Sequence, residues 1–158
     1  MTTEDKNKLP EKPLLGEVLI NRNRITPEQL NQALAMQKKE GGFLGEILEN
    51  LGFIEDVDIV VALVVQCNFP YIAINKYEID QGVIQLIPAD FAKSRRVIPL
   101  DRVGNVLSIV MANPLDLAIK AEIQRITNCA VAPFIATRKE IQSALERWYG
   151  KEVSNGYV

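Results

Sequence analysis

Few side chains in this sequence suit acid–base or nucleophilic chemistry, because the chain contains no histidine. Histidine is the usual general base near neutral pH and a common ligand of transition metals. Carboxylates remain, but they lie at expected helix starts or on expected solvated faces. Their spacing in the sequence does not place any group of them at one site; the carboxylates concerned are Glu17, Glu46, Asp56, Asp58 and Asp116. The phosphate-binding pattern Gly-x-x-x-x-Gly-Lys-Ser/Thr is also missing. We therefore expect a protein that is not an enzyme and that has no metal site and no cofactor.

The two cysteines offer no alternative chemistry. Cys67 and Cys129 are flanked by apolar residues and have no spacing typical of a metal site or a disulfide framework. A free cysteine in such surroundings behaves as a small hydrophobic side chain. We interpret both as buried structural thiols.

A duplication is the strongest pattern in the sequence. Residues 14–37 return as residues 43–66, and nine of the 24 positions are identical between the copies. A duplicated unit of this length is a supersecondary element that buries its apolar face against its copy. The copies should therefore form one body with pseudo-two-fold symmetry, connected by a turn at Gly41-Gly42.

Each copy predicts two helices. In the first copy Thr26 can cap the second helix, Pro27 fits its first position and Gln29 completes a capping box. The first helix is short, and it ends near residues 21–23 in the first copy and at Gly52 in the second. The second helix of the second copy is apolar nearly all round and should be the more buried of the two.

After residue 95 the pattern predicts a small α/β unit. Apolar runs on either side of Gly104-Asn105 read as a hairpin, which Asn113-Pro114 ends. A helix over about 115–126, a strand over 131–135 and a last helix from Thr137 to Gly150 follow. The fold class is α+β: a duplicated helical hairpin repeat followed by a ββαβα subdomain.

Composition agrees with an ordinary globular protein. The chain has 158 residues, of which 47% are hydrophobic and 24% charged, with a net charge of −2. This charge disfavours nucleic acid as a partner, and the apolar runs are too short for membrane insertion. We expect a cytoplasmic protein organised as a flexible lead-in (1–13), the repeat (14–67), a connector (68–94), the α/β subdomain (95–150) and a tail (151–158).

The layout of the copies resembles the MshEN domain, the N-terminal domain of the GspE/PilB family of secretion and pilus assembly ATPases. Leu-Gly opens each copy at its second and third places, and Gln37 and Gln66 end the copies. The segments 97–100, 111–116 and 144–150 are similar to the second half of that region. The resemblance implies a bacterial regulatory domain of type II secretion or type IV pilus systems. It also implies that some members bind cyclic di-GMP and act on a motor.

In such members the apolar side chains of both copies cover the guanine and ribose faces, and the final glutamine hydrogen-bonds a base edge. Mostly apolar walls with a few polar groups suit a small-molecule site. Carried over by position, the implied ligand-binding residues are Leu14, Leu15, Gly16, Leu19, Ile25, Leu30, Leu34, Gln37, Phe43, Leu44, Gly45, Leu48, Ile54, Ile59, Leu63 and Gln66.

This sequence departs from the family pattern at the first place of the motif. Binding members usually have arginine there, whereas this chain has Leu14 and Phe43. Neither side chain offers the forked donors of a guanidinium, although Arg22, Arg24 or Lys38 could compensate. The same leucines would also serve as an ordinary core between two helical hairpins, and each glutamine would equally serve as a contact near a helix end.

Two functions stay open on these residues. One is a module that senses cyclic di-GMP, favoured by the intact spacing and both glutamines. The other is a docking module without a nucleotide ligand, which contacts a secretion or pilus assembly ATPase or its membrane platform protein. The lost arginines favour this second function. The sequence does not distinguish a stand-alone protein from an excised N-terminal domain.

Overall fold

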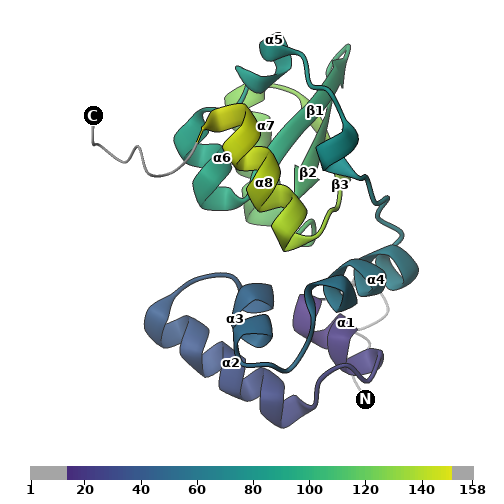
Figure 1. Ribbon diagram of the computed structural model, residues 1–158, viewed down its shortest axis with the longest axis vertical. Coiled ribbons are helices and arrows are strands. Elements are labelled where there is room, and N and C mark those ends of the chain that lie inside the picture. Colours follow the sequence, from purple (N-terminus) through teal and green to yellow (C-terminus); the bar gives the residue numbers. More distant parts are fainter. Residues whose placement is uncertain (1–13, 151–158) are drawn as a thin grey trace, which may run out of the picture.

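The computed structural model describes residues 14–150, so the expected lead-in and tail lie outside the described residues. Over this range the chain forms a group of four helices followed by a three-stranded sheet with further helices around it (Figure 1). This is the α+β fold that the sequence predicts. Within residues 14–150 no helix is long and apolar enough to cross a membrane.

The helical repeat contains two helices from each copy. The first copy forms α1 (Leu15–Asn21) and α2 (Pro27–Glu40), and the second forms α3 (Leu44–Asn50) and α4 (Asp56–Cys67). The expected turn between the copies is present, because Gly41 and Gly42 have φ angles of +76° and +100° that other residues rarely adopt. Helix α1 packs on α4 and α2 packs on α3. A two-fold axis between the copies exchanges α1 with α3 and α2 with α4, so these two contacts are equivalent.

The local signals for the second helices are confirmed. Thr26 accepts the Gln29 N–H at 3.1 Å and the Gln29 side chain returns to the Thr26 N–H at 2.9 Å, so the capping box closes. Helix α4 buries three residues where α2 buries one, as its apolar composition predicts. Val64 and Val65 of α4 nevertheless remain exposed.

The connector begins without a regular helix or strand. Tyr71 forms an isolated parallel bridge to Ile135, but the chain already turns into a short 3-10 helix at η2 (Ile74–Lys76). Two short helices follow, α5 (Gln81–Ile84) and α6 (Ala89–Arg95).

The remaining elements form the α/β part. They are β1 (Val97–Val103), β2 (Val106–Met111), α7 (Leu117–Thr127), β3 (Ala130–Phe134) and α8 (Arg138–Tyr149). Strand β2 lies in the middle, antiparallel to β1 and parallel to β3. A parallel neighbour requires a crossover connection, and α7 supplies it. The Thr137–Glu140 capping box begins α8 and Gly150 ends it, as predicted.

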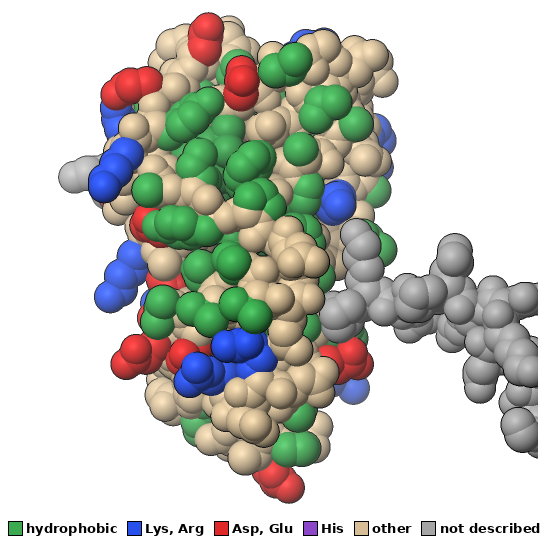
Figure 2. Space-filling model, turned by 90° about the vertical axis from the view of Figure 1, so that its right-hand side faces the viewer, with side chains coloured by type: hydrophobic (Ala, Val, Ile, Leu, Met, Phe, Trp, Pro, Cys, Tyr) green, Lys and Arg blue, Asp and Glu red, His purple; other side chains and the backbone are tan. Residues whose placement is uncertain are grey.

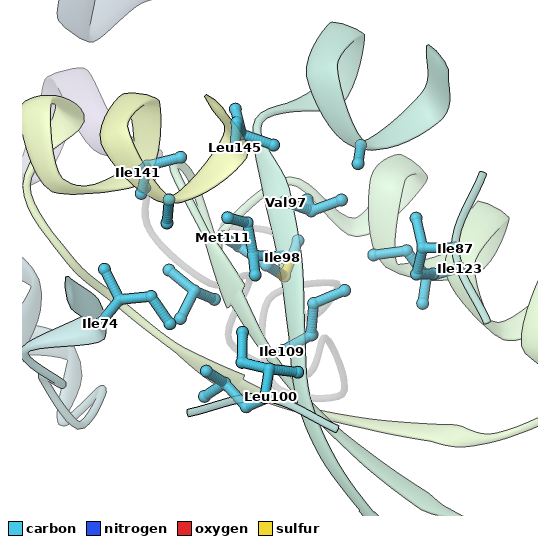
Figure 3. Packing of buried hydrophobic residues seen from close by; sticks show 14 of the residues in the cluster. Ile74, Ile87, Val97, Ile98, Leu100, Ile109, Met111, Ile123, Ile141 and Leu145 are labelled. Atoms are coloured by element: carbon cyan, nitrogen blue, oxygen red, sulfur yellow. The ribbon is translucent and has the colours of Figure 1, made fainter. Parts of the chain in front are cut away.

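Two apolar clusters stabilise the described part of the chain. The larger lies between the sheet and the helices of the α/β part, where residues such as Ile98, Ile109, Met111 and Ile141 are almost completely buried (Figure 3). The second fills the helical repeat. Leu115 and Ile135 come from the α/β part but are buried in this second cluster, so the two parts share apolar contacts.

Candidate functional site

The glycine of each copy marks a close contact between that copy's two helices. A Cβ atom on Gly16 would lie 2.6 Å from Leu30 Cδ1, and one on Gly45 would lie 2.8 Å from Ile59 Cδ1. Leu30 and Ile59 are equivalent by the duplication, as are the two glycines. The Leu-Gly pair of the motif therefore has a packing role in both copies: glycine allows the second helix to cross the first at short range.

Half of the twelve apolar side chains implied as a ligand wall are buried in the repeat core. Six of them have at most 6% of their surface exposed: Leu15, Leu19, Ile25, Leu48, Ile54 and Leu63. Such residues cannot cover a ligand without rearrangement of the core. Leu30, Leu44 and Ile59 are half-buried. At these buried positions the duplicated pattern therefore forms the core of the repeat.

The first copy leaves an open apolar surface. Leu14 is 66% exposed and Leu34 is 41% exposed. Gln37, which ends the copy, donates from Nε2 to the backbone carbonyl of Gly42 at 3.0 Å. This contact near a helix end is one of the two roles that the sequence leaves open for the glutamine. Gln66, its counterpart, is exposed.

The corresponding surface of the second copy is covered by the α/β part. The Arg96 guanidinium lies over the Phe43 ring, 5.7 Å from its centre, and pairs with Glu46 at 3.0 Å. Arg138, the first residue of α8, pairs with Glu49 at 3.0 Å and with Glu46 at 3.5 Å. We call this set of contacts, with Asp56, the junction.

Asp56 completes the junction at the start of α8. Its carboxylate accepts the backbone N–H of Arg138 at 2.9 Å and that of Lys139 at 3.2 Å. These are two of the four N–H groups that a helix leaves without an intrahelical partner at its N-terminus. A negative charge there is also favoured by the helix dipole. A residue of the second copy therefore caps α8.

The junction corrects one expectation from the sequence. Glu46 and Asp56 are not merely residues at helix starts or on solvated faces, since both contact the α/β part. Partial burial works to lower the pKa of the Arg138 guanidinium, but the contacts with Glu49 and then Glu46 outweigh it and raise that pKa. Arg96, Arg138 and Glu49 were missed at the sequence level, because no local pattern shows that arginines and carboxylates so distant in the chain would pair.

A small pocket lies beneath the junction. It has a volume of about 60 Å³ and is lined by five of the implied ligand residues together with side chains of the α/β part. Those five are Leu15, Phe43, Leu44, Gly45 and Ile59. The volume is far below the roughly 300–1,000 Å³ of pockets that hold drug-sized ligands. Its charged lining, Glu46, Glu49, Asp56, Arg96 and Arg138, carries one more negative than positive charge. A dinucleotide with two phosphates would find neither room nor favourable charge there.

Comparisons with known proteins identify the family. The family model of the MshEN domain matches residues 67–155, which covers the end of α4, the connector and the α/β part. The matches to individual proteins extend over the repeat as well. The type IV pilus assembly ATPase PilB of Myxococcus xanthus is 28% identical over 138 residues, 87% of this chain and 24% of the relative. PilB of Thermus thermophilus is 30% identical over 137 residues, 85% of this chain and 15% of the relative.

A solved structure described as MshE with cdg, the cyclic di-GMP ligand, shares the fold. It has a TM-score of 0.68 and 28% sequence identity, and the alignment covers 87% of this chain and all of that one. This chain spans about a quarter or less of the length of the two PilB relatives. On the family match and the shared fold, the chain belongs to the MshEN domain family.

Proposed function

We propose that this chain is a non-catalytic regulatory domain of a bacterial secretion or pilus assembly motor, acting in the cytoplasm. The repeat receives a signal and the α/β part relays it. The relatives support this function, because PilB proteins are pilus assembly ATPases of which the present fold is only a part. Fold likeness alone would not be enough. The observation that carries the proposal is the junction, which ties the second copy to Arg96, the residue before β1, and to α8.

The signal that we propose is cyclic di-GMP, and its site is the open surface of the first copy. Leu14 and Leu34 are apolar and exposed there, and Gln37 lies at the end of the same copy. The 28% identical relative MshE was solved with this ligand. The second copy would contribute through Gln66, which is exposed, rather than through the half-buried Phe43, which lies under Arg96.

Binding should be weak, because the first-place guanidinium is missing from both copies. Arg24, which could compensate, lies 3.7 Å from Asp58, so part of its charge is already neutralised. Arg96 is committed to Glu46 and Phe43. A site built on exposed leucines and one or two glutamines retains apolar contact area but lacks a strong donor to a phosphate or base edge.

Calorimetric titration with cyclic di-GMP tests this function. The wild-type protein should bind weakly, and Leu14→Arg should strengthen binding by about 1.5–3 kcal/mol, the worth of hydrogen bonds to a charged group. That gain is roughly 10- to 150-fold in affinity. Leu117→Arg is a matched control, because Leu117 is also an exposed leucine but lies on α7 of the α/β part. No binding by either wild type or Leu14→Arg would contradict the proposed ligand.

A second candidate function is a docking module with no nucleotide ligand. Helix α4 exposes Val57, Val64 and Val65, which share one face at steps of seven and eight residues. Figure 2 shows hydrophobic side chains over both the upper and lower parts of the face on which α4 lies. Exposed apolar surface of this kind is typical of contact sites. The partner would be a secretion or pilus assembly ATPase or its membrane platform protein. Weakened co-purification of such an ATPase with a Val65→Asp variant, at unchanged stability, would favour this function.

A further inference from the structure

The two copies of the repeat differ in whether their equivalent surfaces are covered. Leu14 is exposed, whereas its counterpart Phe43 lies under Arg96. Glu17 is exposed and accepts the Leu14 N–H of its own copy, whereas its counterpart Glu46 pairs with Arg96. The first copy therefore shows that a copy folds with this surface open. The cover on the second copy is not required for the local fold of that copy.

The contacts that hold the cover are polar and partly solvated. The side chains of Glu46, Glu49, Arg96 and Arg138 each keep between 19% and 34% of their surface exposed. Ion pairs that water reaches are worth little individually. Polar interfaces between the parts of a chain resemble transient contacts more than permanent ones. The pocket beneath the junction leaves this side of the contact between the two parts incompletely packed.

The apolar contacts between the two parts lie next to the chain connection. Ile135 is buried in the helical cluster, and its N–H donates to the Pro70 carbonyl at 2.9 Å while its own carbonyl accepts the Ile72 N–H at 3.0 Å. Leu115 joins the same cluster. This side can therefore stay closed while the ionic side separates.

We propose that the junction is a latch: it opens without unfolding of either part, pivots near Ile135 and uncovers the second-copy surface around Phe43. The inference rests on the proposed function in one respect: the opening would be the step that relays the signal to the motor. It is a property of the free chain and is tested without any ligand. Its failure is therefore distinguishable from a failure of cyclic di-GMP to bind.

Thiol labelling of the whole chain tests the latch. Ala136 lines the pocket with 6% of its surface exposed, so Ala136→Cys introduces a thiol that only opening would expose. Native Cys129, buried in the α/β core, is an internal reference for unfolding of that part. Labelling of each thiol is followed by peptide mass spectrometry and normalised to its rate in denaturant. We expect Ala136→Cys to react at least tenfold faster than Cys129.

Variants that remove one charge of the junction then test whether the ionic contacts control the opening. Adding Arg138→Ala removes the pairs with both Glu46 and Glu49, so it should accelerate labelling at position 136 roughly 2- to 30-fold and leave the rate at Cys129 unchanged. Glu46→Gln should act in the same direction and serves if Arg138→Ala does not fold. Arg95→Ala is the matched control, because Arg95 pairs with Glu122 inside the α/β part at 3.4 Å. It should change neither rate.

Two outcomes would overturn the latch. One is equal normalised labelling of the thiol at position 136 and of Cys129, which would mean that the pocket opens only when the α/β part unfolds. The other is an equal acceleration of both thiols by the charge-removing variants, which would mean general destabilisation.

Discussion

Removal of the Asp56 carboxylate should destabilise the protein through a helix 82 residues away in the sequence. Asp56 accepts the first two N–H groups of α8 at 2.9 and 3.2 Å. Hydrogen bonds to a charged group contribute about 1.5–3 kcal/mol, and the favourable interaction with the helix dipole is of similar or smaller size. The freed N–H groups can regain water, because Lys139 is exposed. We therefore expect Asp56→Ala to lower the free energy of unfolding by about 2 kcal/mol, which is less than the two hydrogen bonds would contribute if water could not replace them.

Thermal unfolding followed by circular dichroism measures this effect. For a chain of this size, about 2 kcal/mol corresponds to a decrease in Tm of about 4–8 °C. Asp56→Asn should lose about half as much, because the amide keeps one acceptor oxygen but loses the charge. Glu28→Ala is the control: Glu28 is an exposed acidic residue in the first turn of α2, in the other copy. If Asp56→Ala costs no more than Glu28→Ala, the contact between Asp56 and α8 does not contribute to stability and the reasoning is refuted.

Three further predictions concern the core, a turn and a buried phenol. Leu19→Ala and Leu48→Ala should each lower the free energy of unfolding, measured with urea, by about 2–5 kcal/mol, because these equivalent leucines are fully buried. A decrease for only one of the two variants would mean that the cores of the two copies are not packed equivalently. Gly104→Ala should cost about 1–2 kcal/mol, because Gly104 has a φ of +60° in the hairpin turn, and an unchanged urea midpoint would show that this turn tolerates a side chain. Burial raises the pKa of Tyr149, so the folded state favours the neutral phenol: its contribution to stability is fully present below about pH 10 and is lost as pH rises further. Between about pH 10 and 12 the free energy of unfolding of Tyr149→Phe should therefore decrease less than that of the wild type. Parallel plots of this free energy against pH for the two proteins would contradict the prediction.

The repeat and the order of elements could be predicted from the sequence because they depend on local signals. The capping boxes at Thr26 and Thr137 form between residues three positions apart, so they are visible in any short window of sequence. The hairpin at Gly104 depends likewise on a short turn between apolar runs. Duplication of a pattern requires only comparison of the chain with itself, which is why the four helices of the repeat were placed correctly.

The candidate site was less predictable, because exposure is decided by what packs on a helix rather than by the helix itself. Leu14 and Leu15 are neighbours of the same type, yet one is exposed and the other buried. The motif implied one set of ligand residues, and the structure divides it into core, half-buried and exposed positions. The roles of these residues in binding remain a prediction.

The sequence by itself determined the duplicated helices, the α/β elements, the lack of histidine chemistry and the resemblance to the MshEN domain. Tertiary structure alone decided that the two copies are not equivalent, since Arg138 reaches Glu46 across 92 residues of chain and Asp56 caps α8. The physical reason is the range of the interactions. Helix propensity, capping and turn preference act over a few residues, whereas an ion pair or a helix cap between distant segments depends on packing that brings those segments together.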